Sequence, residues 1–314
     1  MSLPYDAVFL IAFGGPTAPE EIRPFLARVL RGIAVPPERL EEVARHYEAV
    51  GGRSPLNEIT LRQTQALRQA LDKKGLPLPV YVGMRNASPF LAEALRRMAD
   101  DGIHRALGFI LSSHRSEASW DRYQKNVADA ILQLGSASPE VDYCTGWYDH
   151  PLFIQTWVEL IQASLAEIPL GERSVAQLIF TAHSLPLAMA SRSPYVAEVE
   201  TSARLVAAKI GHESWSIAYQ SRSGKPTDPW LEPDIGVLIR KLAADDCKDI
   251  VVAPIGFVCD HVEVLYDLDI EAKKIAEDSG ISMRRASCPN VHPTFIRMIA
   301  EMIEAKVKNS EDRQ

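Results

Sequence analysis

QLIFTAHSLP, residues 177–186, says most about the architecture of this chain. Its apolar start is typical of a buried strand, predicted over residues 176–181. Pro186 lacks the N–H that a central strand needs, so the strand must end before it. We therefore expect His183 to lie in the loop at the carboxyl end of the strand. In open parallel α/β sheets, ligands bind at that edge.

The first half of the chain repeats this arrangement. VFLIAFGGP, residues 8–16, is again an apolar run followed by small residues and a proline. Each of the two segments begins a set of four predicted strands, which indicates two similar domains with a cleft between them. We expect the domains to join near residues 150–151.

Strand-like and helix-like patterns alternate along the whole chain. This alternation predicts right-handed βαβ units and an α/β fold of two Rossmann-like domains, each a four-stranded parallel sheet flanked by helices. The predicted strands are residues 7–12, 80–84, 106–111, 140–144, 176–181, 216–220, 250–254 and 281–285. The predicted helices are residues 38–50, 59–73, 89–101, 121–134, 152–165, 196–210, 231–243, 262–278 and 293–306.

These patterns divide the chain into four parts. The amino-terminal domain is expected over residues 1–149 and the carboxyl-terminal domain over residues 150–290. Residues 291–308 are expected to contain a final helix that packs back across the molecule, and residues 309–314 a tail.

Composition narrows the function. The 314 residues are 46% hydrophobic and 24% charged, which is typical of a soluble globular protein. A net charge of −7 without a basic cluster argues against nucleic-acid binding. No apolar stretch approaches the roughly 18 residues of a membrane span. The four cysteines are widely spaced, so we expect free thiols in a reducing cytoplasm.

Several common catalytic motifs are absent from the sequence. It contains no GxGxxG, no GxxxxGK[ST], no HExxH and no GxSxG around Ser184. His261 and Glu263 match the start of the zinc deaminase signature, but the PCxxC that should follow is missing.

A row of carboxylates is predicted beside the core in residues 254–271, PIGFVCDHVEVLYDLDIE. At about 100° per residue, Asp260, Glu263, Asp267 and Glu271 share one side of a helix. This side borders the apolar stripe instead of lying opposite to it, as a purely solvated face would. Such carboxylates suit a divalent cation. Alternatively, acids in the first turn complement the helix dipole, which accounts for the first two only. His183 could likewise be a structural histidine.

Three loops are rich in aromatic and basic residues. They are residues 46–57, 112–123 and 219–234. Aromatic faces with nearby arginines suit a flat apolar ligand that carries carboxylates at its rim. Each loop could instead serve only packing and surface charge.

These motifs together resemble the ferrochelatase family of class II chelatases, which insert ferrous iron into a porphyrin. The resemblance covers about residues 6–300 and rests on AFGGP, HYEAVGGRSPLN, FTAHSLP, YQSRSG, DPWLEPD and GFVCDHVEVLYDLDIE. It implies two Rossmann-like domains with the porphyrin cleft between them. It also implies a lyase of haem b biosynthesis that exchanges two pyrrole protons for Fe²⁺.

The resemblance also implies roles for individual residues. His183 and Glu263 match the groups that face the porphyrin centre and contact the metal, without deciding which of them takes the protons. Asp267 and Glu271 match a row that holds or conducts the metal. Matching porphyrin-pocket positions are Phe13, Tyr47, Ser54 and Tyr123, with Arg31, His46 and Arg53 beside them. Phe13 cannot supply the phenolate that some relatives place there.

Within the family, VLYDLD and RGIAVPPERL (residues 31–40) most resemble the coproporphyrin III branch. That substrate has four carboxylates where protoporphyrin IX has two, and Arg31, Arg45, His46, Arg53 and Arg115 could bind the additional ones. Nothing after Cys288 could supply the clustered cysteines of a [2Fe–2S] centre, so no cofactor beyond substrate Fe²⁺ is expected.

The expected ligands are porphyrin and Fe²⁺, and the protein is expected to be a monomer. Transient contacts with other haem-pathway enzymes are compatible with this expectation. A non-catalytic haem or porphyrin carrier of the same fold remains an alternative. A metal-dependent hydrolase is another, although the sequence lacks a third closely spaced ligand.

Overall fold

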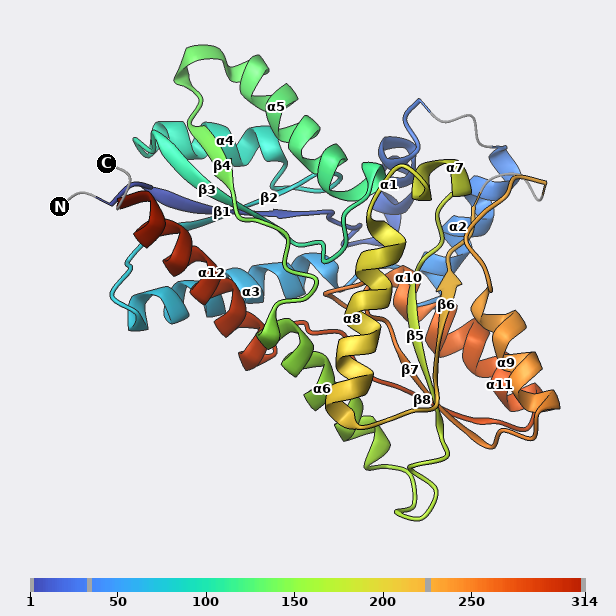
Figure 1. The fold of residues 1–314 in the computed structure, drawn as a ribbon. Coiled ribbons are helices and arrows are strands. Elements are labelled where there is room, and N and C mark those ends of the chain that lie inside the picture. The colour runs from blue at the N-terminus through green and yellow to red at the C-terminus, as the bar shows by residue number, and fades with distance from the viewer. Residues whose placement is uncertain (1–2, 33–35, 224–226, 312–314) are drawn as a thin grey trace.

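The computed structural model describes residues 3–32, 36–223 and 227–311. It contains two parallel sheets of four strands each, with the orders β2-β1-β3-β4 and β6-β5-β7-β8 (Figure 1). The predicted α/β fold with two parallel sheets is therefore confirmed. The two orders are the same when the second sheet is counted from its own first strand, so both halves share one topology.

The strands lie within one or two residues of their predicted positions. The first sheet contains β1 Ala7–Ala12, β2 Val80–Met84, β3 Arg105–Ile110 and β4 Glu140–Tyr143. The second contains β5 Gln177–His183, β6 Trp215–Gln220, β7 Asp249–Ala253 and β8 Ser282–Arg285. Every residue of β1 is buried, as its unbroken apolar sequence predicts for a strand covered on both faces.

Helices cover both faces of each sheet (Figure 1). The first sheet lies between the pair α3 Leu56–Lys73 and α12 Pro293–Glu311 and the pair α4 Leu91–Asp100 and α5 Arg122–Leu134. The second lies between α6 Pro151–Leu165 with α8 Tyr195–Ile210 and α9 Ile235–Ala244 with α11 Lys273–Asp278. The remaining helices are α1 Ile22–Val29, α2 Pro37–Ala49, α7 Leu187–Ala190 and α10 Val262–Leu265. Two π-helical turns, Glu117–Asp121 and Asp267–Ala272, precede α5 and α11.

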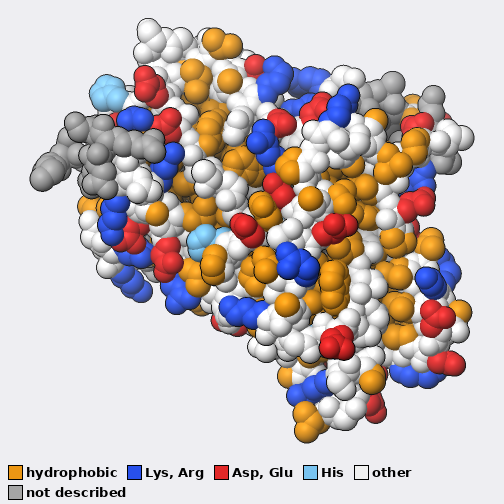
Figure 2. Space-filling model, viewed as in Figure 1, with side chains coloured by type: hydrophobic (Ala, Val, Ile, Leu, Met, Phe, Trp, Pro, Cys, Tyr) orange, Lys and Arg blue, Asp and Glu red, His pale blue; other side chains and the backbone are white. Residues whose placement is uncertain are grey.

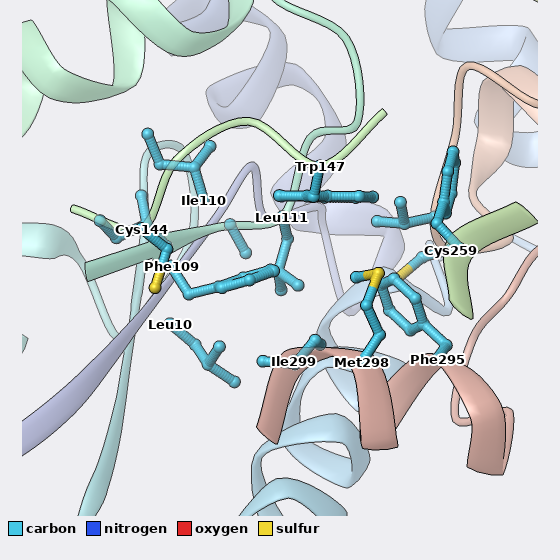
Figure 3. Close-up of a cluster of buried hydrophobic side chains, with 14 of the residues drawn as sticks. Leu10, Phe109, Ile110, Leu111, Cys144, Trp147, Cys259, Phe295, Met298 and Ile299 are labelled. Carbon is cyan, nitrogen blue, oxygen red and sulfur yellow. The ribbon is translucent and has the colours of Figure 1, made fainter. Parts of the chain in front are cut away.

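The two sheets share one continuous apolar core. Figure 3 shows part of it, where Trp147 and Phe109 lie close to Phe295 and Met298 of α12 and to Cys259 of the second half. The rings of Trp147 and Phe109 stack with centroids 5.7 Å apart. The large shared core implies that the two domains are held in one arrangement.

The carboxyl-terminal helix differs from its prediction. Helix α12 continues to Glu311, so the tail expected from residue 309 is helical as far as residue 311, and residues 312–314 lie outside the described part. It packs between α3 and α6. The predicted division into domains at residues 149 and 290 remains a prediction.

The surface mixes charges of both signs. On the face shown in Figure 2, basic and acidic side chains are interspersed among apolar ones. In the described part of the chain, no helix is long and apolar enough to cross a membrane.

Candidate active site

His183 is the last residue of β5 and not a loop residue as predicted. Its Nδ1 lies 2.5 Å from the Ser184 carbonyl oxygen, which can only accept, so Nδ1 carries the proton. The lone pair is therefore on Nε2. The Tyr195 hydroxyl donates to the His183 carbonyl at 3.0 Å. The side chain is 33% exposed, which leaves Nε2 accessible to a substrate.

Glu263 lies opposite His183, in the first turn of α10. His261 caps this helix, because its Nδ1 accepts from the Glu263 N–H at 3.1 Å. The buried Gln220 side chain donates to the Glu263 carbonyl at 2.7 Å. These contacts place the Glu263 Oε2 3.9 Å from the His183 Nε2. The nitrogen and the oxygen are too far apart for a direct hydrogen bond. They are close enough for both to contact one metal ion or one proton-bearing group.

The carboxylate row is not on one continuous α-helix. Helix α10 ends at Leu265, and the π-turn Asp267–Ala272 follows, in which the Glu271 N–H donates to the Tyr266 carbonyl at 3.0 Å. A π-turn inserts one residue into the helical path and is frequent at functional sites. The Asp267 side chain lies within electrostatic reach of both Glu263 and Glu271, so these three carboxylates form the predicted row.

Asp267 is the most perturbed carboxyl group of this row. Burial raises the pKa of Asp267 to about 8, and the charges of Glu263 and Glu271 act in the same direction. The Ser221 hydroxyl donates a hydrogen bond to it. Burial also raises the pKa of Glu271, helped by nearby Asp234. The inner part of the row is therefore poorly solvated and readily accepts positive charge, whether from a proton or a metal ion.

Asp260 does not belong to the row, which corrects the sequence prediction. It pairs with Arg285, whose Nη1 lies 2.9 Å from the Asp260 Oδ1. Its other carboxylate oxygen accepts from the Asn290 side chain at 2.6 Å. Asp260 lies before α10 begins, where 100° per residue does not apply, and a partner distant in sequence determines its direction.

Aromatic residues of the amino-terminal domain lie beside these carboxylates. Tyr47 of α2 is buried, and its pKa is raised by burial and by the charges of Glu263 and Asp267. Burial raises the pKa of Tyr123 to about 12, with a further contribution from Glu263. Both predicted pocket tyrosines are thus near Glu263, across the boundary between the halves.

Arg85, which was not among the predicted residues, lies against two of the predicted pocket residues. Its guanidinium carbon lies 5.4 Å from the ring centroid of Phe13 and 5.0 Å from that of Tyr123. Its Nε donates to the Asn126 side chain at 2.8 Å. Burial lowers its pKa, and the titratable groups that influence it in the described part of the chain are Tyr123 and Arg122, neither of them a carboxylate. Arg85 directly follows β2, at the carboxyl edge of the sheet, and this position in the sequence could have predicted that it lies near the ligand.

The other predicted pocket residues differ in their surroundings. The His46 ring stacks on that of Tyr266 at 3.8 Å, so one face is already covered. Ser54 is buried and packs closely against Gly15. Arg31 and Arg53 are exposed, whereas Arg115 pairs with Asp121 at 3.1 Å. Of the segment 31–40, residues 33–35 lie outside the described part.

In the described part of the chain, His183 and Glu263 are not members of a larger group of metal-ligand side chains. Within residues 3–32, 36–223 and 227–311, no three His, Cys, Asp or Glu side chains gather in a way that could hold a metal ion. Surface hollows of about 360 and 710 Å³ are lined by none of the predicted site residues. His183 and Glu263 offer two donors, which leaves further ligands of a metal ion to come from water or substrate.

The sequence is similar to known proteins over nearly its full length. A ferrochelatase family model matches residues 5–307. The coproporphyrin III ferrochelatase of Mycobacterium leprae (strain Br4923) is 43% identical over 303 residues, covering 96% of this chain and 89% of the relative. The ferrochelatase of Rhodopirellula baltica is 40% identical over 307 residues, covering 97% and 87%.

Solved structures support the fold alone. SirB from Bacillus subtilis with Fe³⁺ has a TM-score of 0.58 and 10% sequence identity, covering 98% of this chain and 97% of the other. The sirohydrochlorin chelatase SirB from Bacillus subtilis subspecies spizizenii in complex with cobalt has a TM-score of 0.56 and 11% identity. Because the family model matches almost the whole sequence and relatives exceed 40% identity over 96% of it, this chain belongs to the ferrochelatase family.

Proposed function

We propose that this chain inserts Fe²⁺ into coproporphyrin III, with His183 and Glu263 acting at the centre of the macrocycle. Ferrochelatases are lyases that exchange the two pyrrole protons of a porphyrin for Fe²⁺ in haem biosynthesis. The observation that carries the residue assignment is the convergence of the His183 Nε2 and the Glu263 Oε2 at 3.9 Å, beside Tyr47 and Tyr123.

The proposed chemistry needs two protons removed and one hydrated cation stripped of water. The proton on His183 Nδ1 is held by a carbonyl, so Nε2 is free to accept a pyrrole proton or to bind the metal. Glu263 is 44% exposed and can exchange protons with solvent. The two protons leave through these groups as the four pyrrole nitrogens take the metal.

Asp267 and Glu271 are proposed to hold the incoming Fe²⁺. They lie on the π-turn directly behind Glu263, in surroundings that favour the arrival of positive charge. Carboxylate oxygens are suitable ligands for a divalent cation, and the half-buried position of Asp267 weakens competition from water there. The metal would pass from this row to the pair His183 and Glu263.

Two observations support coproporphyrin III as the substrate, namely the descriptions of similar proteins and the positions of three arginine side chains. Relatives more than 40% identical are described as coproporphyrin III ferrochelatases. Arg85 is a largely buried guanidinium whose titratable neighbours include no carboxylate, and a buried cation of this kind favours an anionic ligand. Exposed Arg31 and Arg53 could bind further carboxylates at the rim.

An absorbance assay tests this proposal. Purified protein is supplied with Fe²⁺, or Zn²⁺ as a stable surrogate, and with each of the two porphyrins at equal detergent concentration. We expect a higher kcat/KM for coproporphyrin III, and a smaller preference in Arg31→Ala and Arg53→Ala. Equal or better efficiency with protoporphyrin IX would overturn the substrate assignment and leave the chelatase activity standing.

The alternatives are not favoured by family membership. A porphyrin carrier would bind haem tightly without inserting metal, which the same assay would reveal. A hydrolase would need a third metal ligand, and no three candidate side chains gather in the described ranges.

We also propose that the protein needs no iron–sulfur cluster and acts as a monomer in the cytoplasm. The support for the first point is that burial raises the pKa of Cys144 and Cys259 to about 12, which disfavours the thiolates that iron requires. Visible [2Fe–2S] bands in anaerobically purified protein would contradict it, and sedimentation would test the monomer.

A further inference from the structure

Arg285 connects the two ends of the segment that carries the carboxylate row. It is the last residue of β8, and only 14% of its side chain is exposed. Its Nε and Nη2 donate to the two oxygens of Asp269 at 2.6 and 2.9 Å, while Nη1 donates to Asp260 at 2.9 Å. Asp260 lies just before Glu263, and Asp269 lies in the π-turn just after Asp267. One guanidinium therefore clamps both sides of the row.

The Asp260 end of this clamp is anchored in the other domain. The Asn290 side chain donates to Asp260 at 2.6 Å, and the Asp260 N–H donates back to it at 2.9 Å. The Asn290 carbonyl accepts from Gln63 of α3 at 2.7 Å. Because α3 belongs to the amino-terminal half, the clamp has a fixed support outside the helix that it holds.

The Asp269 end acts on the register of the π-turn. If the extra residue of the turn were absorbed elsewhere, the side chains after it would rotate by about 100° about the helix axis. Glu271 would then leave the row and Asp269 would leave the guanidinium. The planar fork of arginine matches a carboxylate in one orientation with two parallel bonds, so it selects a single register.

We propose that Arg285 is a positioning residue for metal delivery, which acts through Asp269 to keep Asp267 and Glu271 in line with Glu263. This inference rests on the proposed function of the row. It predicts an effect on the metal and not on the porphyrin, because the hydrogen bonds of Arg285 in the described part of the chain go to Asp260, Asp269 and the Ala286 carbonyl, and none goes to a predicted porphyrin-pocket residue.

Arg284 provides a matched control. It is the preceding residue on β8, its side chain is 19% exposed, and it pairs with Asp249 of β7 at 2.7 Å. Arg284→Met and Arg285→Met thus remove the same charge from neighbouring half-buried positions. Among the described residues, the Asp249 side chain pairs with Arg284 and its carbonyl accepts from Cys247, with no hydrogen bond or ion pair to the row, so only the second substitution should release the π-turn.

The experiment measures kcat and the separate KM values for Zn²⁺ and porphyrin in both variants. We expect Arg285→Met to raise the metal KM by roughly 10- to 100-fold, which is the usual effect of replacing a residue that supports a metal ligand. The porphyrin KM should stay within about twofold of wild type. Arg284→Met should leave both KM values near wild type. Arg285→Lys should recover only part of the loss, because an ammonium cannot bind both oxygens of Asp269 in parallel.

Amide hydrogen exchange supplies a readout independent of activity. Faster exchange at residues 267–272 is expected in Arg285→Met and not in Arg284→Met. Should Arg285→Met fail to fold, Asp269→Asn breaks the same contact at a more exposed partner and should raise the metal KM alike. Equal effects of the two arginine substitutions, or a change mainly in the porphyrin KM, would overturn the inference. Absence of metal insertion by the wild-type protein would instead refute the proposed function.

Discussion

The two halves of the molecule have the same backbone plan and different chemistry. In each, the third strand of the half, β3 or β7, is followed by a π-turn and then a helix, and in the second half the short helix α10 comes before the turn. The turn Glu117–Asp121 is capped by Ser116 and buries Trp120, whereas the turn Asp267–Ala272 holds carboxylates beside Glu263. The same local geometry thus serves packing in one half and charge in the other.

The residues at the carboxyl ends of the strands also differ in chemistry between the two halves. Phe13 follows β1 and Arg85 follows β2, while His183 ends β5 and Gln220 ends β6. The amino-terminal half therefore offers aromatic faces and a cation, suited to a flat anionic ligand. The carboxyl-terminal half offers an imidazole and carboxylates, suited to protons and a metal ion. A duplicated topology positions two sets of side chains, and their residue types separate the roles.

The strongest test of this division is His183→Ala. Metal insertion should fall by roughly two to four orders of magnitude, because the side chain that takes a proton or binds the metal is gone. Porphyrin binding, measured by quenching of protein fluorescence, should change little since the aromatic contacts come from the other half. Near-normal turnover in a folded variant would remove His183 from the site.

Asp267→Asn tests the metal side of the comparison. The amide keeps the size of the side chain and an acceptor for the Ser221 hydroxyl, and it cannot offer a negative charge to a cation. We expect a metal KM about tenfold higher or more, with the porphyrin KM unchanged. If the porphyrin KM rises instead, the row contacts the macrocycle and the two roles are not separate.

His114 tests how firmly the halves are joined. Burial lowers its pKa to about 3, and its ring lies between the hydroxyls of Ser113 and Ser202, at 2.9 and 3.0 Å, which belong to different halves. Between pH 6.5 and 3 the unfolded chain binds a proton that the folded one does not, so stability falls as the pH is lowered through this range.

A variant without His114 should therefore lose less stability at low pH, so its unfolding free energy should depend less on pH. In His114→Gln the drop in unfolding free energy between pH 7 and pH 5 should be about 2 kcal/mol smaller than in wild type. Urea unfolding at both pH values measures it, with exposed His104→Gln as the control. An unchanged pH profile would show that His114 is not held neutral in the fold.

Arg85→Met is expected to give the smallest of these effects, on the porphyrin side. The variant loses one charged hydrogen bond to a carboxylate of the porphyrin. This loss should raise the porphyrin KM about tenfold and leave the metal KM unchanged. Arg122→Met, which removes a nearby exposed charge, should have little influence. A larger effect on the metal KM would place Arg85 with the carboxylate row and weaken the division between the halves.

Most of the fold could be read from the sequence because its signals are local. Buried parallel strands need unbroken apolar runs, and these placed the strands to within two residues. The pairing of His183 with Glu263 as candidates came from the motifs shared with the ferrochelatase family. Helix α1 was missed because it is short and contains Pro24. The end of β5 was placed too early, since Pro186 restricts only its own neighbourhood and leaves His183 free to pair with β6.

The arrangement within the site depended on partners far apart in sequence. No glycine or proline marks the change from α10 to the π-turn, and the Arg285 clamp on Asp269 and Asp260 comes from another strand. Arg85 likewise meets Phe13 and Tyr123 only where the ends of β1 and β2 come together with the start of α5. Periodicity reports which face of an element is buried, whereas the direction of an ion pair or a cation–π contact is determined by packing between elements.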